Sequence, residues 1–202
     1  PTNNETVLHS LRVYAFVDGQ PAGHFYTKDG LDVNNPSFLM HLTMYSTMTQ
    51  KVDFYVVANE AAMETPGSSV LLTENTTETQ LNHFTFTKLN TSKGLPMFCK
   101  QTETIDLTQL SDKTPADPGH AGHTLLRQDL TFELKRPIGK LGVFAAKPVG
   151  ENSSLRVTGL TVLASGTRTR NYLMPQTDET LKAITGITGD ISLEVVEEEV
   201  TK

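Results

Sequence analysis

The sequence predicts an all-β protein, a two-sheet β-sandwich of about seven strands. Segments in which apolar and polar residues alternate with a period of two recur at short intervals along the 202 residues. This alternation is typical of half-buried strands. Threonine is abundant and tryptophan is absent, which favours strands with polar outer faces. Hydrophobic residues make up 37% of the chain, enough for a packed core without disulfide bonds.

The first predicted element is a β-hairpin. Alternate apolar residues within residues 7–17 share one face, as expected for a strand. The Asp18-Gly19-Gln20 sequence that follows has the composition of a tight turn. Residues 22–26 then resume an extended pattern, so a hairpin is the simplest interpretation.

Two more strands are predicted before residue 60. Residues 38–45 alternate after the break at Asn34-Asn35-Pro36. Residues 51–59 carry the clearest pattern in the chain, with apolar side chains on one face and a mixed second face. The apolar set consists of Val52, Phe54, Val56 and Ala58. This segment is expected to be a central strand.

The middle of the chain is predicted to contain a short helical or irregular excursion and then further strands. Residues 60–63 and 70–81 favour the excursion, which a Pro66-Gly67 turn divides. The Pro- and Gly-containing stretch 111–123 reads as a loop. Further strands are expected at 102–107, 125–134, 138–146 and 155–164.

A change in the sequence pattern after residue 165 predicts a domain edge. Residues 1–165 form the predicted sandwich domain, and residues 166–202 form a C-terminal extension or the start of an incomplete second β-domain. This last part contains one expected short helix, residues 178–184, and one expected strand, residues 191–196. Two such elements are too few to fold alone.

The charge of the chain argues against a nucleic-acid partner. The formal net charge is -6 and the sequence pI is about 5.5. Binding to a phosphate backbone needs a concentrated basic surface, and the sequence shows none. The acidic excess gathers partly in the last residues, where it favours a solvated face or tail.

The sequence offers no convincing catalytic or cofactor site. Cys99 is the only cysteine, so it is expected to be a small core residue and no internal disulfide or Cys-based zinc site is predicted. Asp117, His120 and His123 could reach one metal ion, but they lie in a Gly- and Pro-containing loop without an obvious fourth ligand. A solvated loop is the preferred interpretation. Nucleophile-elbow and phosphate-loop motifs are missing, so neither an enzyme, a cofactor nor a metal is predicted.

Four short segments, in this order and spacing, carry a family resemblance. They are Leu11-Arg12-Val13-Tyr14-Ala15-Phe16 with Asp18-Gly19, then Phe54-Tyr55-Val56-Val57-Ala58-Asn59, then Leu95-Pro96-Met97, then Leu134-Lys135-Arg136-Pro137-Ile138-Gly139-Lys140-Leu141. The chain resembles the fimbrillin superfamily of Bacteroidales, which includes major and minor fimbrial subunits and fimbrillin-associated anchor proteins. The resemblance covers residues 5–165.

The resemblance implies a transthyretin-like, Greek-key β-sandwich that is exported as a lipoprotein precursor and joins a pilus at the outer membrane. In that family a protease removes an N-terminal strand after an arginine, and a strand of a neighbouring subunit fills the groove. Such strand addition supplies both ladder bonds and buried side chains. Arg12 is the candidate processing position, although an arginine inside a strand is more often an outward-facing residue. No apolar run approaches the roughly 18 residues of a membrane-spanning helix, so membrane attachment is expected only through a lipid anchor on the precursor.

The function predicted from these observations is that of a structural subunit or anchor of a bacterial surface fimbria, which supports adhesion. Expected partners are other fimbrial subunits and a host surface protein or glycan. Residues 191–200 either open a second domain, which is preferred, or act as the exchanged strand. The alternative function is a secreted, monomeric carbohydrate- or ligand-binding β-sandwich. The absence of tryptophan and an aromatic content of 7% count against a sugar-stacking platform.

Overall fold

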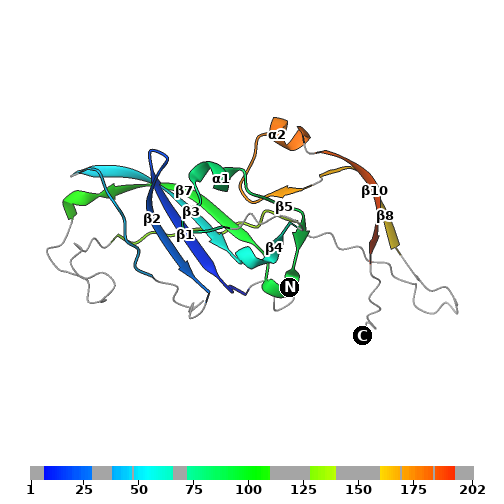
Figure 1. Cartoon of the computed structure of the whole chain (residues 1–202), viewed down its shortest axis with the longest axis horizontal. Coiled ribbons are helices and arrows are strands. Elements are labelled where there is room, and N and C mark those ends of the chain that lie inside the picture. Colours follow the sequence, from blue (N-terminus) through cyan, green and yellow to red (C-terminus); the bar gives the residue numbers. More distant parts are fainter. Residues whose placement is uncertain are drawn as a thin grey trace, which may run out of the picture. The chain divides into compact units, whose positions relative to one another are not determined.

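The computed structural model describes residues 7–28, 38–46, 48–65, 72–109, 128–139, 160–168, 170–183 and 185–193. These residues form mostly antiparallel strands with only short helices (Figure 1), so the all-β prediction is confirmed. The chain forms two compact units. The first contains residues 1–137 with Asn171–Pro175, and the second contains Ile138–Arg170 with Gln176–Lys202.

The first unit is built on four long strands. These are β1 (Leu11–Val17), β2 (Gln20–Thr27), β3 (Thr49–Ala58) and β7 (Met97–Asp106). Its short strands are β4 (Met63–Glu64), β5 (Thr85–Phe86), β6 (Lys88–Leu89) and β9 (Asn171–Tyr172). Its helices are α1 (Glu78–Asn82) and the 3-10 turns η2 (Glu60–Ala62), η3 (Thr91–Lys93) and η4 (Leu107–Gln109).

The second unit contains β8 (Leu160–Arg168), α2 (Asp178–Ala183) and β10 (Thr185–Leu193). β8 and β10 pair in antiparallel fashion. The α2 helix confirms the helix expected at residues 178–184. The expected strand at residues 191–196 overlaps β10, which begins earlier in the chain. The predicted domain edge after residue 165 falls inside β8, and the boundary itself stays a prediction.

The long strands form one antiparallel sheet in the order β2-β1-β3-β7. β1 and β2 are joined by the predicted hairpin turn, in which Asp18 has φ 49 and Gly19 has φ 77. Two successive residues with positive φ are the signature of the turn type whose twist suits a two-residue hairpin. β3 lies between β1 and β7, so the prediction of a central strand is confirmed.

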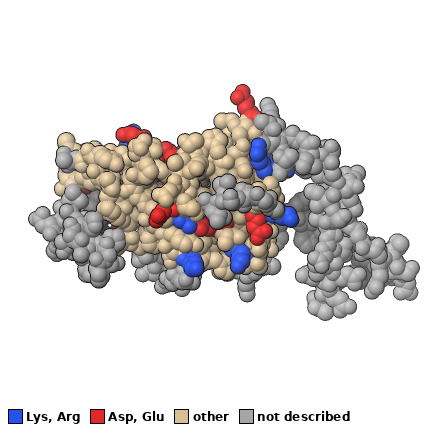
Figure 2. All heavy atoms as spheres, in the orientation of Figure 1, with Lys and Arg blue, Asp and Glu red and all other residues tan. Residues whose placement is uncertain are grey.

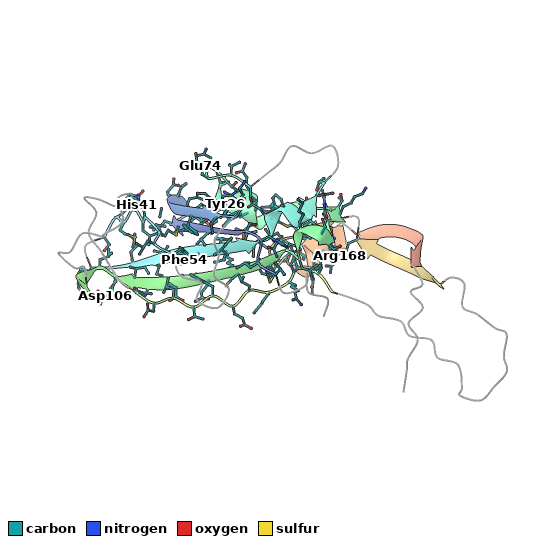
Figure 3. The ribbon with its side chains drawn as sticks, turned by 90° about the horizontal axis from the view of Figure 1, so that it is seen from below. Tyr26, His41, Phe54, Glu74, Asp106 and Arg168 are labelled. Carbon is teal, nitrogen blue, oxygen red and sulfur yellow. The ribbon has the colours of Figure 1, made fainter. Side chains whose placement is uncertain are left out.

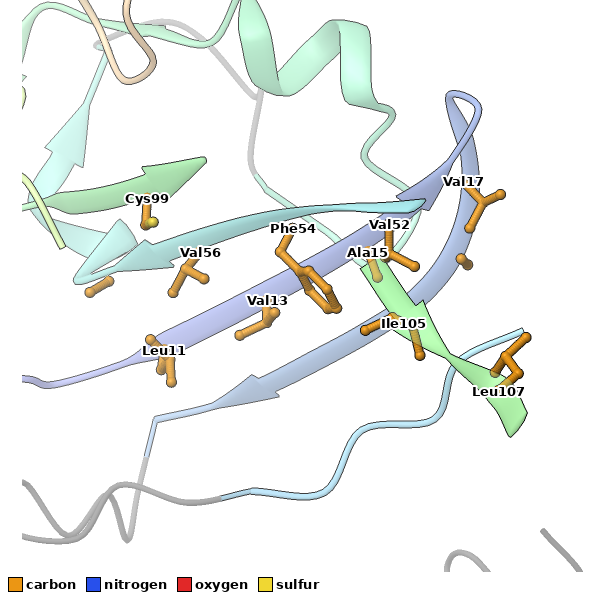
Figure 4. Packing of buried hydrophobic residues seen from close by; sticks show 12 residues of the cluster. Leu11, Val13, Ala15, Val17, Val52, Phe54, Val56, Cys99, Ile105 and Leu107 are labelled. Carbon is orange, nitrogen blue, oxygen red and sulfur yellow. The ribbon is translucent and has the colours of Figure 1, made fainter. Parts of the chain in front are cut away.

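One side of this sheet, here called the apolar face, is a continuous layer of buried side chains (Figure 4). Residues at alternate positions of β1 and β3 supply most of it, because side chains along a strand alternate between faces. Its members are Leu11, Val13, Ala15, Val17, Ala22, Val52, Phe54, Val56, Ala58, Cys99, Ile105 and Leu107. Cys99 is thus the small core residue that the sequence predicted.

The opposite side of the sheet is also buried. Tyr14, Phe16 and Tyr55 lie there under Leu81 of α1 and under Leu173. The α1 helix begins with a capping box formed by the side chains of its N-cap threonine and a glutamine three residues later. Because β1 and the second half of β3 are covered on both sides, β1 is apolar or aromatic at every position except Arg12, and β3 is so from Phe54 to Ala58.

Replacement of Tyr55 with phenylalanine is expected to lower the free energy of unfolding by about 1 kcal/mol. The Tyr55 hydroxyl donates a hydrogen bond to Glu78 Oε1 at 2.7 Å and joins α1 to the sheet. Burial, followed by the bond to Glu78, raises the pKa of Tyr55. Urea unfolding followed by circular dichroism measures the loss. An unchanged midpoint and slope would show that this bond does not stabilise the fold.

Candidate interaction site on the four-stranded sheet

Two extended segments lie along opposite edges of the apolar face. The first flanking segment consists of residues 38–46, and the second consists of residues 128–135. Both were predicted as parts of strands, and both show the predicted alternation of half-buried and exposed residues. Neither is part of a strand ladder, apart from one isolated bridge at Lys135. Alternate apolar residues of both segments pack on the apolar face, while a second sheet over this face is not formed by the described residues. The sandwich topology stays a prediction.

The first flanking segment packs on the β2 edge. Thr43 N donates to Ala22 O at 2.6 Å, and the Phe38 ring stacks on Phe25 with centroids 4.3 Å apart. A Cβ at Gly23 would lie 2.4 Å from His41 O, so this close approach requires glycine at position 23.

The outward side of the first flanking segment is partly apolar. Leu39 is 50% exposed and Tyr45 is 66% exposed, while the alternate residues of the segment turn toward the apolar face. Segment 38–46 therefore places apolar side chains both on the core and at the surface. Exposed apolar residues in an extended segment are a recurrent feature of surfaces that bind another chain.

The second flanking segment lies beside β7. Phe98 and Lys135 exchange both main-chain hydrogen bonds, at 2.8 and 2.7 Å. Farther along, glutamine side chains make the contacts: Gln101 Nε2 donates to Thr131 O, and Gln128 Nε2 donates to Thr104 O, each at 3.3 Å.

The inward side chains of the second flanking segment complete the contact with the sheet. Leu130, Phe132 and Leu134 pack against the apolar face, and the rings of Phe132 and Phe54 lie 5.5 Å apart between centroids. Side-chain packing and two glutamine amides thus join most of this segment to the sheet, where a regular strand would use a ladder.

Arg12 is the second residue of β1 and lies on the side opposite the apolar face. It is 7% exposed and forms a two-pronged ion pair with Glu60, with Nε–Oε2 at 2.6 Å and Nη2–Oε1 at 2.7 Å. Its guanidinium also lies 3.9 Å from the centroid of the Tyr26 ring. Because β1 is paired on both edges, cleavage after Arg12 requires β1 to leave the sheet. Processing at this position stays a prediction.

A small pocket lies near the β2 edge, with a volume of about 270 Å³. Tyr14 and His24 line it from the sheet, His41 lines it from the first flanking segment, and Glu74 lines it from the loop before α1. His41 and Glu74, both labelled in Figure 3, line this pocket together. The pocket combines aromatic surface with hydrogen-bonding groups, a mixture suited to a small polar ligand.

The described residues contain no group of three or more His, Cys, Asp or Glu side chains placed to hold a metal ion. Asp117, His120 and His123 lie outside the described residues. Acidic and basic side chains are interspersed on the face that Figure 2 shows, with no continuous basic surface among its described atoms. No helix in the described part of the chain is both long and apolar enough to cross a membrane.

The fold therefore defines an all-β protein whose four-stranded antiparallel sheet carries an apolar face between extended flanking segments. Among solved structures, the chain is similar to a fimbrial assembly protein from Parabacteroides distasonis ATCC 8503, with a TM-score of 0.51 and 17% sequence identity. The match covers 95% of this chain and 67% of that chain. At this identity the likeness shows a shared fold. No protein-family model and no curated protein sequence matches the chain.

Proposed function

We propose that the protein is a structural subunit or anchor of a bacterial surface fimbria and that it assembles by addition of a β-strand from a neighbouring subunit. The observation that carries the proposal is the pair of flanking segments, which are extended and packed on the apolar face yet stand outside any regular ladder. The fold shared with a fimbrial assembly protein supports the same class of function.

An incoming strand would bind by extending the sheet, through main-chain hydrogen bonds and buried side chains. Main-chain groups of an extended segment pair with a new strand, and alternate side chains of that strand enter the apolar layer. A partner that alternates apolar and polar residues fits this site best, because one of its sides would meet buried residues and the other would meet solvent. The second flanking segment is the favoured position, since among its described residues only Lys135 exchanges main-chain to main-chain hydrogen bonds with β7.

In this proposal the protein acts without catalysis and without a cofactor. It is a pilus component at the cell surface, exported as a lipoprotein precursor and linked to the outer membrane, and other fimbrial subunits are its main partners. Adhesion would follow from display of the assembled subunits to a host surface protein or glycan. Processing after Arg12 would supply an opening step, because the cut would fall between the second and third residues of β1, which is one of the two middle strands of the sheet.

The second candidate function is a monomeric module that binds a carbohydrate or another small ligand. The pocket of about 270 Å³ at the β2 edge favours it, because aromatic and hydrogen-bonding side chains meet there. Glycan-array binding by a chain that remains monomeric would support this candidate over strand addition.

Assembly is expected to depend on the inward side of the second flanking segment. Limited digestion with an Arg-specific protease should convert the monomer into multimers. Size-exclusion chromatography with light scattering measures the multimers, and mass spectrometry identifies the chain ends that the digestion produces. Phe132→Asp should lower the assembled fraction about tenfold, because an unpaired charge in an apolar layer is unfavourable by more than about 1.4 kcal/mol.

The matched control is Thr131→Asp, which adds the same charge at the exposed neighbouring position and should leave assembly unchanged. Circular dichroism establishes that both variants are folded before digestion. A wild-type chain that stays monomeric after cleavage would contradict strand-mediated assembly. Normal assembly by folded Phe132→Asp would place the contact elsewhere on the protein.

A further inference from the structure

The side of the sheet opposite the apolar face contains a cluster of polar side chains that joins β2 to β1. Arg12 Nη1 lies 2.9 Å from His24 Nε2, in addition to its two bonds to Glu60. The His24 ring also lies against the Tyr14 ring, with centroids 5.1 Å apart. Arg12 therefore links an edge strand, a middle strand and the η2 turn through one guanidinium group.

The chemistry of arginine fixes the protonation state of His24 in this arrangement. A guanidinium group only donates hydrogen bonds, so Nε2 of His24 must accept, and the ring must be neutral with its proton on Nδ1. A second proton on Nε2 would place two donors and two positive charges 2.9 Å apart. Burial, followed by the charge of Arg12, lowers the pKa of His24, in agreement with the geometry.

Other titratable groups around His24 do not remove this conflict. Glu60 is held by both of its oxygens in the ion pair with Arg12. Glu74 and His41 line the same pocket as His24, one from the loop before α1 and one from the first flanking segment. Tyr14 and Tyr26 face the cluster from β1 and β2. Glu74 favours the charged imidazole, but Arg12 makes the direct contact and opposes it.

β2 is the strand that this conflict would affect. It lies at the edge of the sheet, and Ala22 is its one fully buried residue. β1 and β3, in contrast, are buried along most of their length. An edge strand with so little buried apolar area depends on its ladder and on side-chain contacts, and Arg12–His24 is one of these contacts.

We propose that the Arg12–His24 contact is an acid-sensitive latch: protonation of His24 repels Arg12 and releases β2 from β1. This would open the β1 edge at mildly acidic pH while β3 and β7 remain paired. The latch acts whether or not strand addition is the mode of assembly, since it depends only on contacts within one chain.

The sign of the effect follows from linkage. His24 has its ordinary pKa of about 6.5 when β2 is released and a lowered pKa when β2 is paired. The released state therefore binds more protons as the pH falls below about 6.5, and release becomes more favourable by up to about tenfold per pH unit. The effect stops once the pH is below the lowered pKa of the paired state.

Hydrogen exchange of the whole chain between pH 7.5 and pH 5 tests the latch. Protection factors of β2 amides should fall by up to about tenfold per pH unit below about 6.5 in the wild type, while β3 amides keep theirs. His24→Gln retains an acceptor for Arg12 without titrating and should give a flat profile. His83→Gln, at an exposed position at the end of α1, should behave like the wild type.

Nitrogen NMR of the wild-type imidazole supplies a test that needs no variant. It should show His24 with a proton on Nδ1 and none on Nε2 at pH 7.5. A protonated Nε2 at that pH would overturn the proposal. It would also be overturned by equal loss of protection in wild type and His24→Gln, or by loss of protection in β3 to the same extent as in β2.

Discussion

Replacement of Arg12 with methionine is expected to lower the free energy of unfolding by about 3 kcal/mol, because breaking a buried ion pair leaves a charge without its partner. Glu60 would keep its carboxylate, whose side chain is only 17% exposed, and His24 would lose its donor. Methionine retains an apolar stem of similar length over Tyr26, so lost packing contributes little. Urea denaturation at pH 7.5 measures the change.

The double variant Arg12→Met with Glu60→Met separates the ion pair from its surroundings. Removing both charges leaves no uncompensated group, so the double variant should be more stable than Arg12→Met alone and should lose less than the sum of the single changes. Strictly additive losses would show that the pair is not coupled. Arg12 would then owe its buried position to its contacts with His24 and Tyr26.

Replacement of Asn59 with alanine is expected to remove about 3 kcal/mol of stability. Asn59 is 1% exposed and has φ 55. Its side chain accepts from His9 N at 2.7 Å and donates to Val7 O and Leu95 O, each at 2.9 Å. Alanine would leave three main-chain groups without these partners and would keep the left-handed backbone that L-residues disfavour. Thermal and urea unfolding both report the loss.

Asn59→Gly is the matched control for the backbone. Glycine adopts a positive φ without strain but lacks the amide, so Asn59→Gly should fall between the wild type and Asn59→Ala. Gly94→Ala should reproduce part of the loss from the other side, because a Cβ there would lie 2.6 Å from Asn59 Nδ2 and Gly94 has φ 84. Wild-type stability in Asn59→Gly would show that the side-chain hydrogen bonds contribute nothing.

The parts of the fold that were predicted correctly depend on local sequence. The Asp18-Gly19 pair marks a hairpin turn because few residue pairs tolerate two positive φ angles. The alternation in residues 51–59 identifies a buried strand, and β3 spans Thr49–Ala58. The helix near residue 178 likewise follows from its first-turn acidic residues and apolar spacing.

The flanking segments show where sequence patterns stop being informative. The period-two alternation predicted for residues 38–45 and 125–134 is present in the described parts of both segments, and the side chains that pack on the apolar face belong to one of its two sets. The same period says nothing about whether the main chain meets a partner, since ladder formation depends on segments distant in sequence. The strand predictions at these positions were therefore right in the alternation of buried and exposed side chains and wrong in ladder formation among the described residues.

The polar cluster around Arg12 was also beyond prediction, because Glu60 lies 48 positions away in sequence. One signal was present in the first strand. Its second face carries Arg12, Tyr14 and Phe16, and two aromatic residues beside an arginine are unusual on a solvent-facing side. That composition indicates a strand covered on both sides, in which a buried cation needs a carboxylate partner.

The first unit includes a strand from late in the sequence, because β9 pairs with β5. Leu173 and Met174, at 0% and 2% exposure, complete the core opposite the apolar face, yet they follow β8 in the chain. A ribosome must therefore synthesise most of the second unit before the first can close its core. A chain cut after residue 165 would lack these side chains and β9, so we expect it to expose Tyr14 and Phe16 and to aggregate during synthesis.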